Sequence, residues 1–331
     1  MKKRIELSQA VPVIMLVLLI IAGSIVSDSF FTVTNFSNIL QYAVESAFIA
    51  IGMTFVLLIG GIDLSVGSVM AFASVVAAKM ALAKLPVAAI LPVVLLIGLL
   101  CGVVNGLIIT KLRVEPFMAT LAMMMIMRAS TFIFTGGGPL TGSVEQSFKQ
   151  IIKGAVFHVP VGIWYVLIAF VIAWLAASRT RFGRHVYAVG GGEETAKLFG
   201  VRTDRIKITV YAVSGALAAL SGLLVAARIG IGEPRTGYDY EMTAITVCVV
   251  GGVSMNGGRG TMLGTFIGLM VVSMIKNLLN LLNFDVNGQP IITGMIILVT
   301  ALIVSHEISG KKKQPVKEIS LILPRAVLAA N

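Results

Sequence analysis

Ten apolar segments follow one another along this chain and are separated by short polar stretches. A helix that crosses a bilayer needs about 20 mostly apolar residues, whereas a strand of a membrane barrel needs about 10 of alternating polarity. The segments are continuous runs without that alternation, so they predict an all-α, polytopic helical membrane protein. Their ranges are 11–26, 39–59, 64–82, 86–110, 116–134, 160–177, 208–227, 242–250, 261–282 and 290–304.

The segment 242–250 is too short to cross a hydrocarbon layer of about 30 Å as a helix. It predicts a broken or re-entrant helix, so we expect eight to ten spanning helices. Composition agrees with this class, because only 12% of the residues are charged, against about 25% in soluble domains. We expect one transmembrane domain over residues 1–310 and a cytoplasmic C-terminal tail over 311–331.

The Lys and Arg residues are distributed unevenly between the two sides that this pattern defines. If the N-terminus is cytoplasmic, most of the 26 Lys and Arg lie on the inner side, as the positive-inside rule requires. The sequence therefore predicts a multi-pass membrane protein with both termini cytoplasmic. The basic residues flank membrane segments and lack interleaved aromatic residues, which favours membrane lipid over nucleic acid as their partner.

The longest inner loop, residues 178–207, contains seven basic and three acidic residues between two apolar segments. Within it, the stretch from Glu193 to Phe199 has the signals of a short helix. Acids occupy its first turn, Lys197 lies near its end and Gly200 follows, which suits the helix dipole and a glycine stop. A loop this polar lies in water, so we expect it to meet a soluble partner.

The stretch from Gly60 to Ser68 reads GGIDLSVGS. Gly60 and Gly61 are suited to end one helix, and Asp63 or Ser65 to cap the next by accepting hydrogen bonds from its free amides. The alternative places Asp63 in a gate or in the polar lining of a path, because an ionisable group at membrane depth is usually functional.

A second glycine-rich run resembles this one. VLLIGGIDLSVG over residues 56–67 is similar to VCVVGGVSMNGG over 247–258, and it pairs Gly60 and Gly61 with Gly251 and Gly252. One interpretation is an internal repeat with interrupted helices, as in many transporters. The other is a coincidence of two Gly-Gly helix ends.

Polar side chains within apolar segments are costly in lipid and should face protein or a water-filled cavity. Some of these residues, together with the aromatic residue at the start of the fifth segment, are candidates for a gate or translocation path. The candidates are Glu45, Asp63, Ser65, Asn105, Phe117 and Thr120.

Other chemistry finds little support in the sequence. The three His residues lie far apart and outside any metal-binding motif, so no metal site is expected. No G-x-x-x-x-G-K-[ST] phosphate loop is present, so the chain is not expected to bind a cofactor or to hydrolyse ATP itself. These absences argue against an enzyme.

Four stretches together resemble the permease subunits of bacterial ABC importers for ribose, galactose and similar sugars. They are AIGMTFVLLIGGIDLSVGSVMA (50–71), EPFMATLAMMMIMRA (115–129), RTRFGRHVYAVGGGEETAKLFGV (179–201) and VVGGVSMNGGRGTMLGT (249–265). The resemblance implies a dimer, with itself or with a sister permease, that receives a monosaccharide from a periplasmic or lipoprotein binding protein. It also implies that the chain is a transport subunit of the bacterial inner membrane, driven by a separate cytoplasmic ATPase that binds ATP and Mg²⁺.

The same resemblance implies a role for the short helix in the loop 178–207. It looks like the coupling helix that docks on the ATPase, formed by Glu193, Glu194, Thr195, Ala196, Lys197, Leu198, Phe199 and Gly200. Two residues depart from the family, which commonly has Asn in place of Gly192 and a smaller residue in place of Phe199. Two alternatives remain: a nucleoside, polyol or signalling furanose as cargo, or a secondary transporter driven by an ion gradient.

Overall fold

A computed structural model describes residues 7–285 except 158, together with 288, 289, 291, 292, 294, 295 and 298, with the backbone only for residues 7–11. The expected tail over 311–331 and much of the tenth apolar segment lie outside the described residues. The long or apolar helices are α1 (Leu7–Val26), α2 (Val33–Leu58), α3 (Val66–Leu82), α4 (Val87–Lys111), α5 (Pro116–Thr135), α7 (Val161–Arg179), α10 (Thr203–Ile229), α11 (Tyr240–Val250) and α12 (Met262–Leu281). The shorter elements are α6 (Gln146–Lys153), α8 (Arg181–Gly191), α9 (Glu193–Leu198) and the antiparallel strands β1 (Ala155–Val156) and β2 (Val159–Pro160).

The prediction of an all-α, polytopic membrane protein is confirmed. In the described part of the chain, six helices are long and apolar enough to cross a membrane, namely α2, α4, α5, α7, α10 and α12. Apolar helices of fewer than 18 residues are α3, α11 and the part of α1 from Pro12 to Val26. These nine helices coincide with the first nine apolar segments. The 11-residue α11 is the segment expected to be too short to span.

Helix α10 lies at the centre of the bundle and packs against α4, α3 and α2. Its contact with α4 depends on small residues, because Gly98, Gly102 and Gly106 recur every four residues along one face of α4. A Cβ atom on Gly98 would overlap the carbonyl oxygen of Gly215, and one on Gly102 would overlap that of Tyr211. Close backbone approach of this kind is how membrane helices associate without a hydrophobic driving force.

Helices α2 and α11 both end in a Schellman turn, in which the amides of the two residues after the C-cap bond back to the last helical turn. In α2 these residues are Gly60 and Gly61, as the sequence predicts. In α11 they are Gly252 and Val253. The left-handed residue is therefore Gly60 in α2 but Gly252 in α11. The predicted pairing of Gly60 with Gly251 is out of step by one residue, because Gly251 is itself the C-cap of α11.

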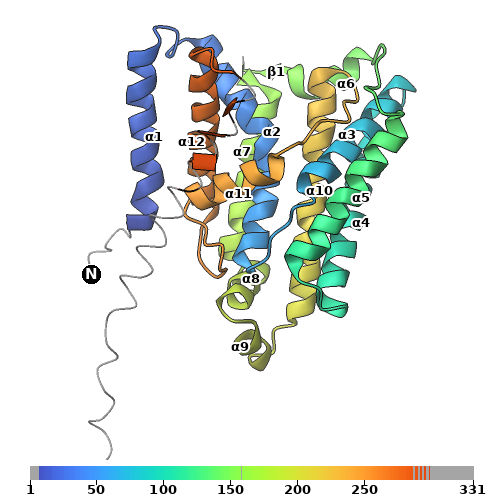
Figure 1. Cartoon of the computed structure of the whole chain (residues 1–331), viewed down its shortest axis with the longest axis vertical. Coiled ribbons are helices and arrows are strands. Elements are labelled where there is room, and N and C mark those ends of the chain that lie inside the picture. Colours follow the sequence, from blue (N-terminus) through green and yellow to red (C-terminus); the bar gives the residue numbers. More distant parts are fainter. Residues whose placement is uncertain are drawn as a thin grey trace, which may run out of the picture.

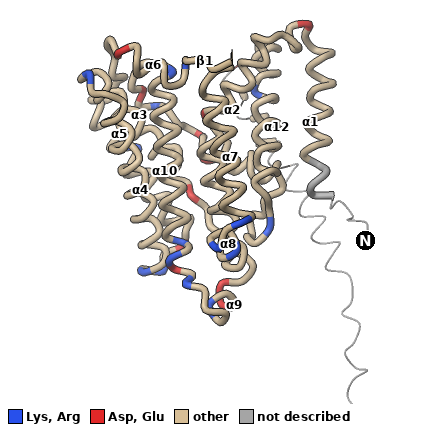
Figure 2. Tube along the Cα trace, turned by 180° about the vertical axis from the view of Figure 1, so that it is seen from behind, with Lys and Arg blue, Asp and Glu red and all other residues tan. Residues whose placement is uncertain are grey.

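The two ends of the bundle differ in structure and charge. Helices α8 and α9 project beyond one end, where α1 also begins, while α6 and β1 lie at the other (Figure 1). Lys and Arg gather at the α8–α9 end, including the adjoining ends of α4 and α10 (Figure 2). The loop that connects α11 to α12 also turns at this end. The helices thus bring the basic residues of the predicted inner side together.

Candidate functional site: the projecting helix and the buried polar network

Helix α9 has the length and signals that the sequence predicts. It runs from Glu193 to Leu198, with Phe199 as C-cap and Gly200 in the left-handed conformation at φ 79°. The amide of Gly200 donates to the carbonyl of Lys197 at 2.9 Å, which is part of a Schellman turn. The glycine is needed at this position because an L side chain is strained at positive φ.

The tip of α9 exposes large apolar side chains outside the bundle. Leu198 is 87% exposed and Phe199 is 84% exposed, whereas Ala196 is buried at 4%. Ala196 therefore forms the inner face of α9, and Leu198 and Phe199 belong to the outer surface. Neighbouring apolar side chains exposed to water in this way usually mark a protein interface.

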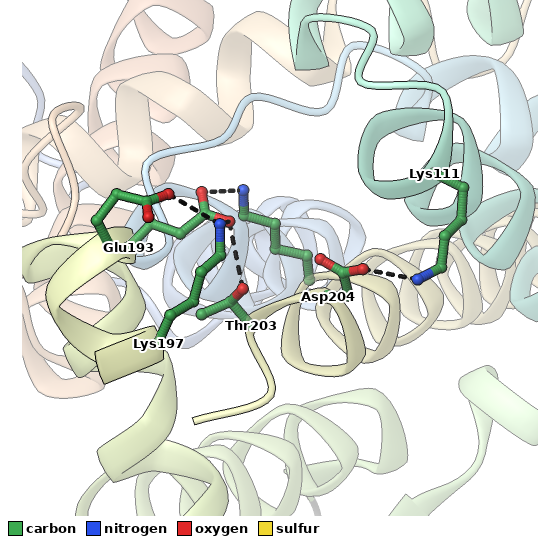
Figure 3. A network of polar contacts seen from close by, with 7 residues as sticks. Lys111, Glu193, Lys197, Thr203 and Asp204 are labelled. Carbon is green, nitrogen blue, oxygen red and sulfur yellow. Dashed lines mark hydrogen bonds and ion pairs between the residues drawn. The ribbon is translucent and has the colours of Figure 1, made fainter. Parts of the chain in front are cut away.

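Ion pairs connect α9 to the start of α10 (Figure 3). The carboxylate of Glu193 binds the ammonium group of Lys207 directly and accepts a hydrogen bond from the Thr203 hydroxyl at 3.3 Å. Lys197 lies 3.3 Å from Glu193 and 2.9 Å from Glu194. A shift of α9 would therefore pull on the first turns of α10.

A second ion pair extends this connection to α4. Lys111, the last residue of α4, donates to the carboxylate of Asp204 on α10 at 2.6 Å (Figure 3). Both side chains are substantially exposed, so the pair contributes at most about 1 kcal/mol. Its role is therefore geometric, because it joins the ends of two helices that also pack through their glycines.

Neighbouring charged groups favour the ionised forms of Glu193 and Lys197 in α9. Burial on its own would raise the pKa of Glu193, but hydrogen bonds and charge attraction from Lys207 and Lys197 outweigh it and hold that pKa below its usual value. Hydrogen bonds to Glu194 and Glu193 raise the pKa of Lys197. Glu193 is therefore ionised throughout the neutral range.

The last turn of α8, just before α9, lies in backbone contact with the end of α2 and with the glycine-rich loop between α11 and α12. A Cβ atom on Gly190 would overlap the carbonyl oxygen of Leu58 at the end of α2 and lie 2.5 Å from the amide nitrogen of Gly258. That amide donates to the same Leu58 carbonyl at 2.9 Å. The Tyr187 hydroxyl of α8 donates to the Gly260 carbonyl at 2.8 Å. We call the meeting of Leu58, Gly190 and Gly258 the glycine junction.

Asp63 lies in the break between α2 and α3 and is 1% exposed. One carboxylate oxygen accepts from the amide of Ser65 at 3.0 Å and from its hydroxyl at 2.6 Å. The other accepts from the hydroxyl of Ser214 on α10 at 2.9 Å. Asn105 of α4 donates to the Ser65 hydroxyl at 3.0 Å, and Thr120 of α5 accepts from the amide of residue 64 at 3.2 Å. This Asp63 network joins the break to α4, α5 and α10.

The predicted side-chain cap on α3 is wrong for Ser65, whereas the carboxylate of Asp63 does accept the free amide of Ser65 at the start of this helix. Ser65 is the N-cap residue but makes no side-chain cap bond, because its backbone (φ −76°, ψ −14°) is already helical, whereas a capping side chain requires an extended residue. Asp63 also accepts from the hydroxyl of Ser65 and from that of Ser214 on α10, so it joins the start of α3 to the central helix.

The six predicted path residues do not form one group. Asp63, Ser65, Asn105 and Thr120 come together in the Asp63 network. The Glu45 carboxylate lies in a different cluster, where it binds Arg228 and accepts from the Tyr240 hydroxyl at 2.6 Å. The remaining candidate, on α5, is Phe117, which is half exposed on the surface of this chain. Among the described residues, no group of three or more His, Cys, Asp or Glu is arranged to hold a metal ion.

A family model described as "Branched-chain amino acid transport system / permease component" matches residues 35–304. The chain belongs to this permease family. The permease is 43% identical to the ribose import permease protein RbsC of Haemophilus influenzae over 292 residues, which cover 87% of this chain and 90% of that protein. The expected resemblance to permeases of this kind is confirmed.

Two further relatives extend the comparison. The ribose import permease protein RbsC of Escherichia coli K12 is 39% identical over 88% of the permease and 91% of its own length. The galactose/methyl galactoside import permease protein MglC of the same strain is 35% identical over 90% and 95%. The search of solved structures finds no match.

Sequence reasoning missed three parts of this site. Two of these parts are the contacts of Glu193 with α10 and the ion pair between Lys111 and Asp204. They connect residues 10 to 93 positions apart, so no local sequence pattern indicates them. The four-residue glycine spacing of α4, by contrast, is visible in the sequence and is a known signal for close helix packing.

Proposed function

We propose that this permease carries a monosaccharide, ribose-like or galactose-like, into the bacterial cell as the transmembrane subunit of an ABC importer. The observation that carries the proposal is the exposed apolar tip of α9, a helix that projects from the bundle and is ion-paired to α10 through Glu193. Its relatives include a ribose import permease and a galactose/methyl galactoside import permease, which supports a sugar as the cargo. The density of Lys and Arg supports a cytoplasmic α8–α9 end, and with it cytoplasmic termini.

The partners follow from this role. A separate ATPase subunit binds ATP with Mg²⁺ and receives Leu198 and Phe199 in a groove. A periplasmic or lipoprotein binding protein delivers the sugar at the opposite end, and a second permease copy, identical or related, completes the path. Most of the selectivity resides in the binding protein, so the path itself needs only weak polar contacts.

The contacts of α9 support a route for the motion. Displacement of α9 by the ATPase pulls on α10 through the Glu193–Lys207 pair and on α4 through the Asp204–Lys111 pair. At the same time, the glycine junction transmits movement of α8 to the end of α2 and to the α11–α12 loop. Helices α10 and α4 contribute Ser214 and Asn105 to the Asp63 network, and the end of α2 adjoins it. The break between α2 and α3 is therefore the part of the gate that responds.

The test is uptake of labelled ribose and galactose into proteoliposomes that contain the permease with its ATPase and binding protein. We expect uptake that needs internal ATP and is abolished by vanadate. Phe199→Glu should abolish co-purification with the ATPase while membrane insertion persists. Phe157→Glu serves as the matched control, because Phe157 is 86% exposed between β1 and β2 at the other end of the bundle.

The alternatives give different results in the same assay. Uptake by the permease alone that collapses with the proton gradient and ignores vanadate would contradict an ABC importer. ATP-dependent uptake of a nucleoside or a polyol in preference to both sugars would retain the importer class and contradict the cargo.

A further inference from the structure

An apolar groove of about 860 Å³ lies between α2, α7 and α10. Its floor includes Phe48 and Phe55 of α2, which are buried, and its rim includes Ile168 and Ile172 of α7, which are 55% and 61% exposed. Apart from Tyr165 and Thr209, every lining side chain is apolar. Because α2, α7 and α10 are spanning helices, the groove opens into the hydrocarbon layer and is filled by hydrocarbon rather than water.

One end of the groove lies beside unpaired positive charge. The groove reaches Phe182 of α8 and Thr209 of α10. Arg181 and Arg184 flank Phe182 along the chain, and Arg205 lies one helical turn before Thr209 and so shares its face of α10. All three arginines are exposed. In the described part of the chain none of them has an acidic partner, whereas Lys111, Lys197 and Lys207 at the same end are all paired.

The combination of an apolar groove and three exposed arginines close in the chain to its lining residues Phe182 and Thr209 matches a lipid with a negatively charged headgroup. A guanidinium group binds phosphate through two parallel hydrogen bonds and is less strongly hydrated than an ammonium group. Along α10 the groove extends over residues 209–224, about 22 Å at 1.5 Å per residue. One leaflet is about 15 Å thick, so a complete acyl chain fits.

We infer that an anionic phospholipid occupies this groove, with an acyl chain against α2, α7 and α10 and its phosphate at Arg181, Arg184 and Arg205. Charge also argues against a second copy of the permease as the occupant. A parallel copy would bring its own basic α8–α9 end toward these arginines, and the chain has a formal net charge of +11. A zwitterionic lipid would fill the groove but would leave the arginines without a net counter-charge.

The test uses full-length permease in phosphatidylcholine nanodiscs that contain a trace of phosphatidylglycerol with a photoreactive acyl chain. We expect labelling of the α7 and α10 peptides that line the groove, and much weaker labelling by photoreactive phosphatidylcholine. The double variant Arg181→Gln/Arg205→Gln should lower the affinity for phosphatidylglycerol roughly 30-fold at low salt. The control Arg113→Gln/Arg259→Gln removes the same charge from loops at the same end and should change nothing.

A second variant tests the groove itself. Ala173 lines it from α7 and is nearly buried, so Ala173→Phe should fill it and abolish groove labelling while leaving the permease inserted and monodisperse. Equal labelling by both lipids, or equal effects of the two double variants, would overturn the proposal, because the groove would then face bulk lipid. Absence of label together with disulfide crosslinking of Ile172→Cys between two copies would also overturn it, since a second permease would cover the groove.

Discussion

The carboxylate of Glu193, the first residue of α9, binds the ammonium group of Lys207, which lies 14 positions later on α10. This ion pair connects the projecting helix α9 directly to α10, the central helix of the bundle. The exposed tip formed by Leu198 and Phe199 takes no part in this ion pair. In the proposed importer, docking of the ATPase and transmission of its motion would therefore depend on different residues.

Replacing Glu193 by Gln should impair transmission more than docking. The substitution removes the charge that binds Lys207 and costs about 1 kcal/mol at the α9–α10 contact. We expect ATPase co-purification within a few-fold of wild type but a clear fall in sugar uptake per ATP hydrolysed, measured in proteoliposomes. Glu194→Gln is the control, since in the described structure Glu194 pairs only with Lys197. Equal coupling ratios in the two variants would contradict this role of Glu193.

The glycine junction predicts a difference between two adjacent glycines. A Cβ at Gly190 would overlap the Leu58 carbonyl, whereas one at Gly191 meets nothing within 4 Å. Gly190→Ala should therefore force α8 away from the end of α2, at a cost of about 1–3 kcal/mol. Its melting temperature and its uptake should fall together, while Gly191→Ala stays near wild type. A stable and fully active Gly190→Ala protein would show that the junction tolerates separation.

Asp63 provides a test of charge against hydrogen bonding. In Asp63→Asn one oxygen still accepts from Ser65, and the hydroxyl of Ser214 accepts from the new amide, so we expect most stability and transport to remain. Asp63→Leu leaves the hydroxyls of Ser65 and Ser214 buried without this partner and should cost about 1–3 kcal/mol for each. Thermal unfolding in detergent and uptake measure both effects. An Asn variant that is stable but inactive would mean that the negative charge itself operates the gate.

The pH dependence of α9 follows from the lowered pKa of Glu193. A carboxyl whose pKa is lower in the folded than in the unfolded state stabilises the fold above its unfolded value of about 4.3, and this stabilisation is lost as the pH falls through the folded value. The contact of α9 with α10 should thus be constant at neutral pH and weaken only in acid. Carboxyl NMR titration checks this, with Lys207→Met expected to raise the pKa of Glu193. Lys111→Met, which removes a different pair, should leave it unchanged.

The features of this protein that could be predicted from its sequence are those that depend on local signals along the chain. Helix α9 was predictable because its signals are local: acids in the first turn, Lys197 near the end and Gly200 at the stop all act within one turn of their neighbours. The same holds for Gly60 and Gly61 at the end of α2. The membrane class and the sidedness of the basic residues were also predictable, because they follow from hydropathy and charge along the chain.

The tertiary structure decided which partners the buried and the ion-paired groups have. The sequence allowed Asp63 to accept an amide at the start of α3, and folding added the hydroxyl of Ser214 from α10 as a further donor. The sequence identified Asn105 and Thr120 as polar residues within apolar segments. It could not show that they contact Ser65 and the backbone beside it, because these contacts form only when three different helices pack together. Packing depends on close approach between distant segments, such as Gly98 with Gly215, and a single sequence states which residues are small but not which surfaces they bring together.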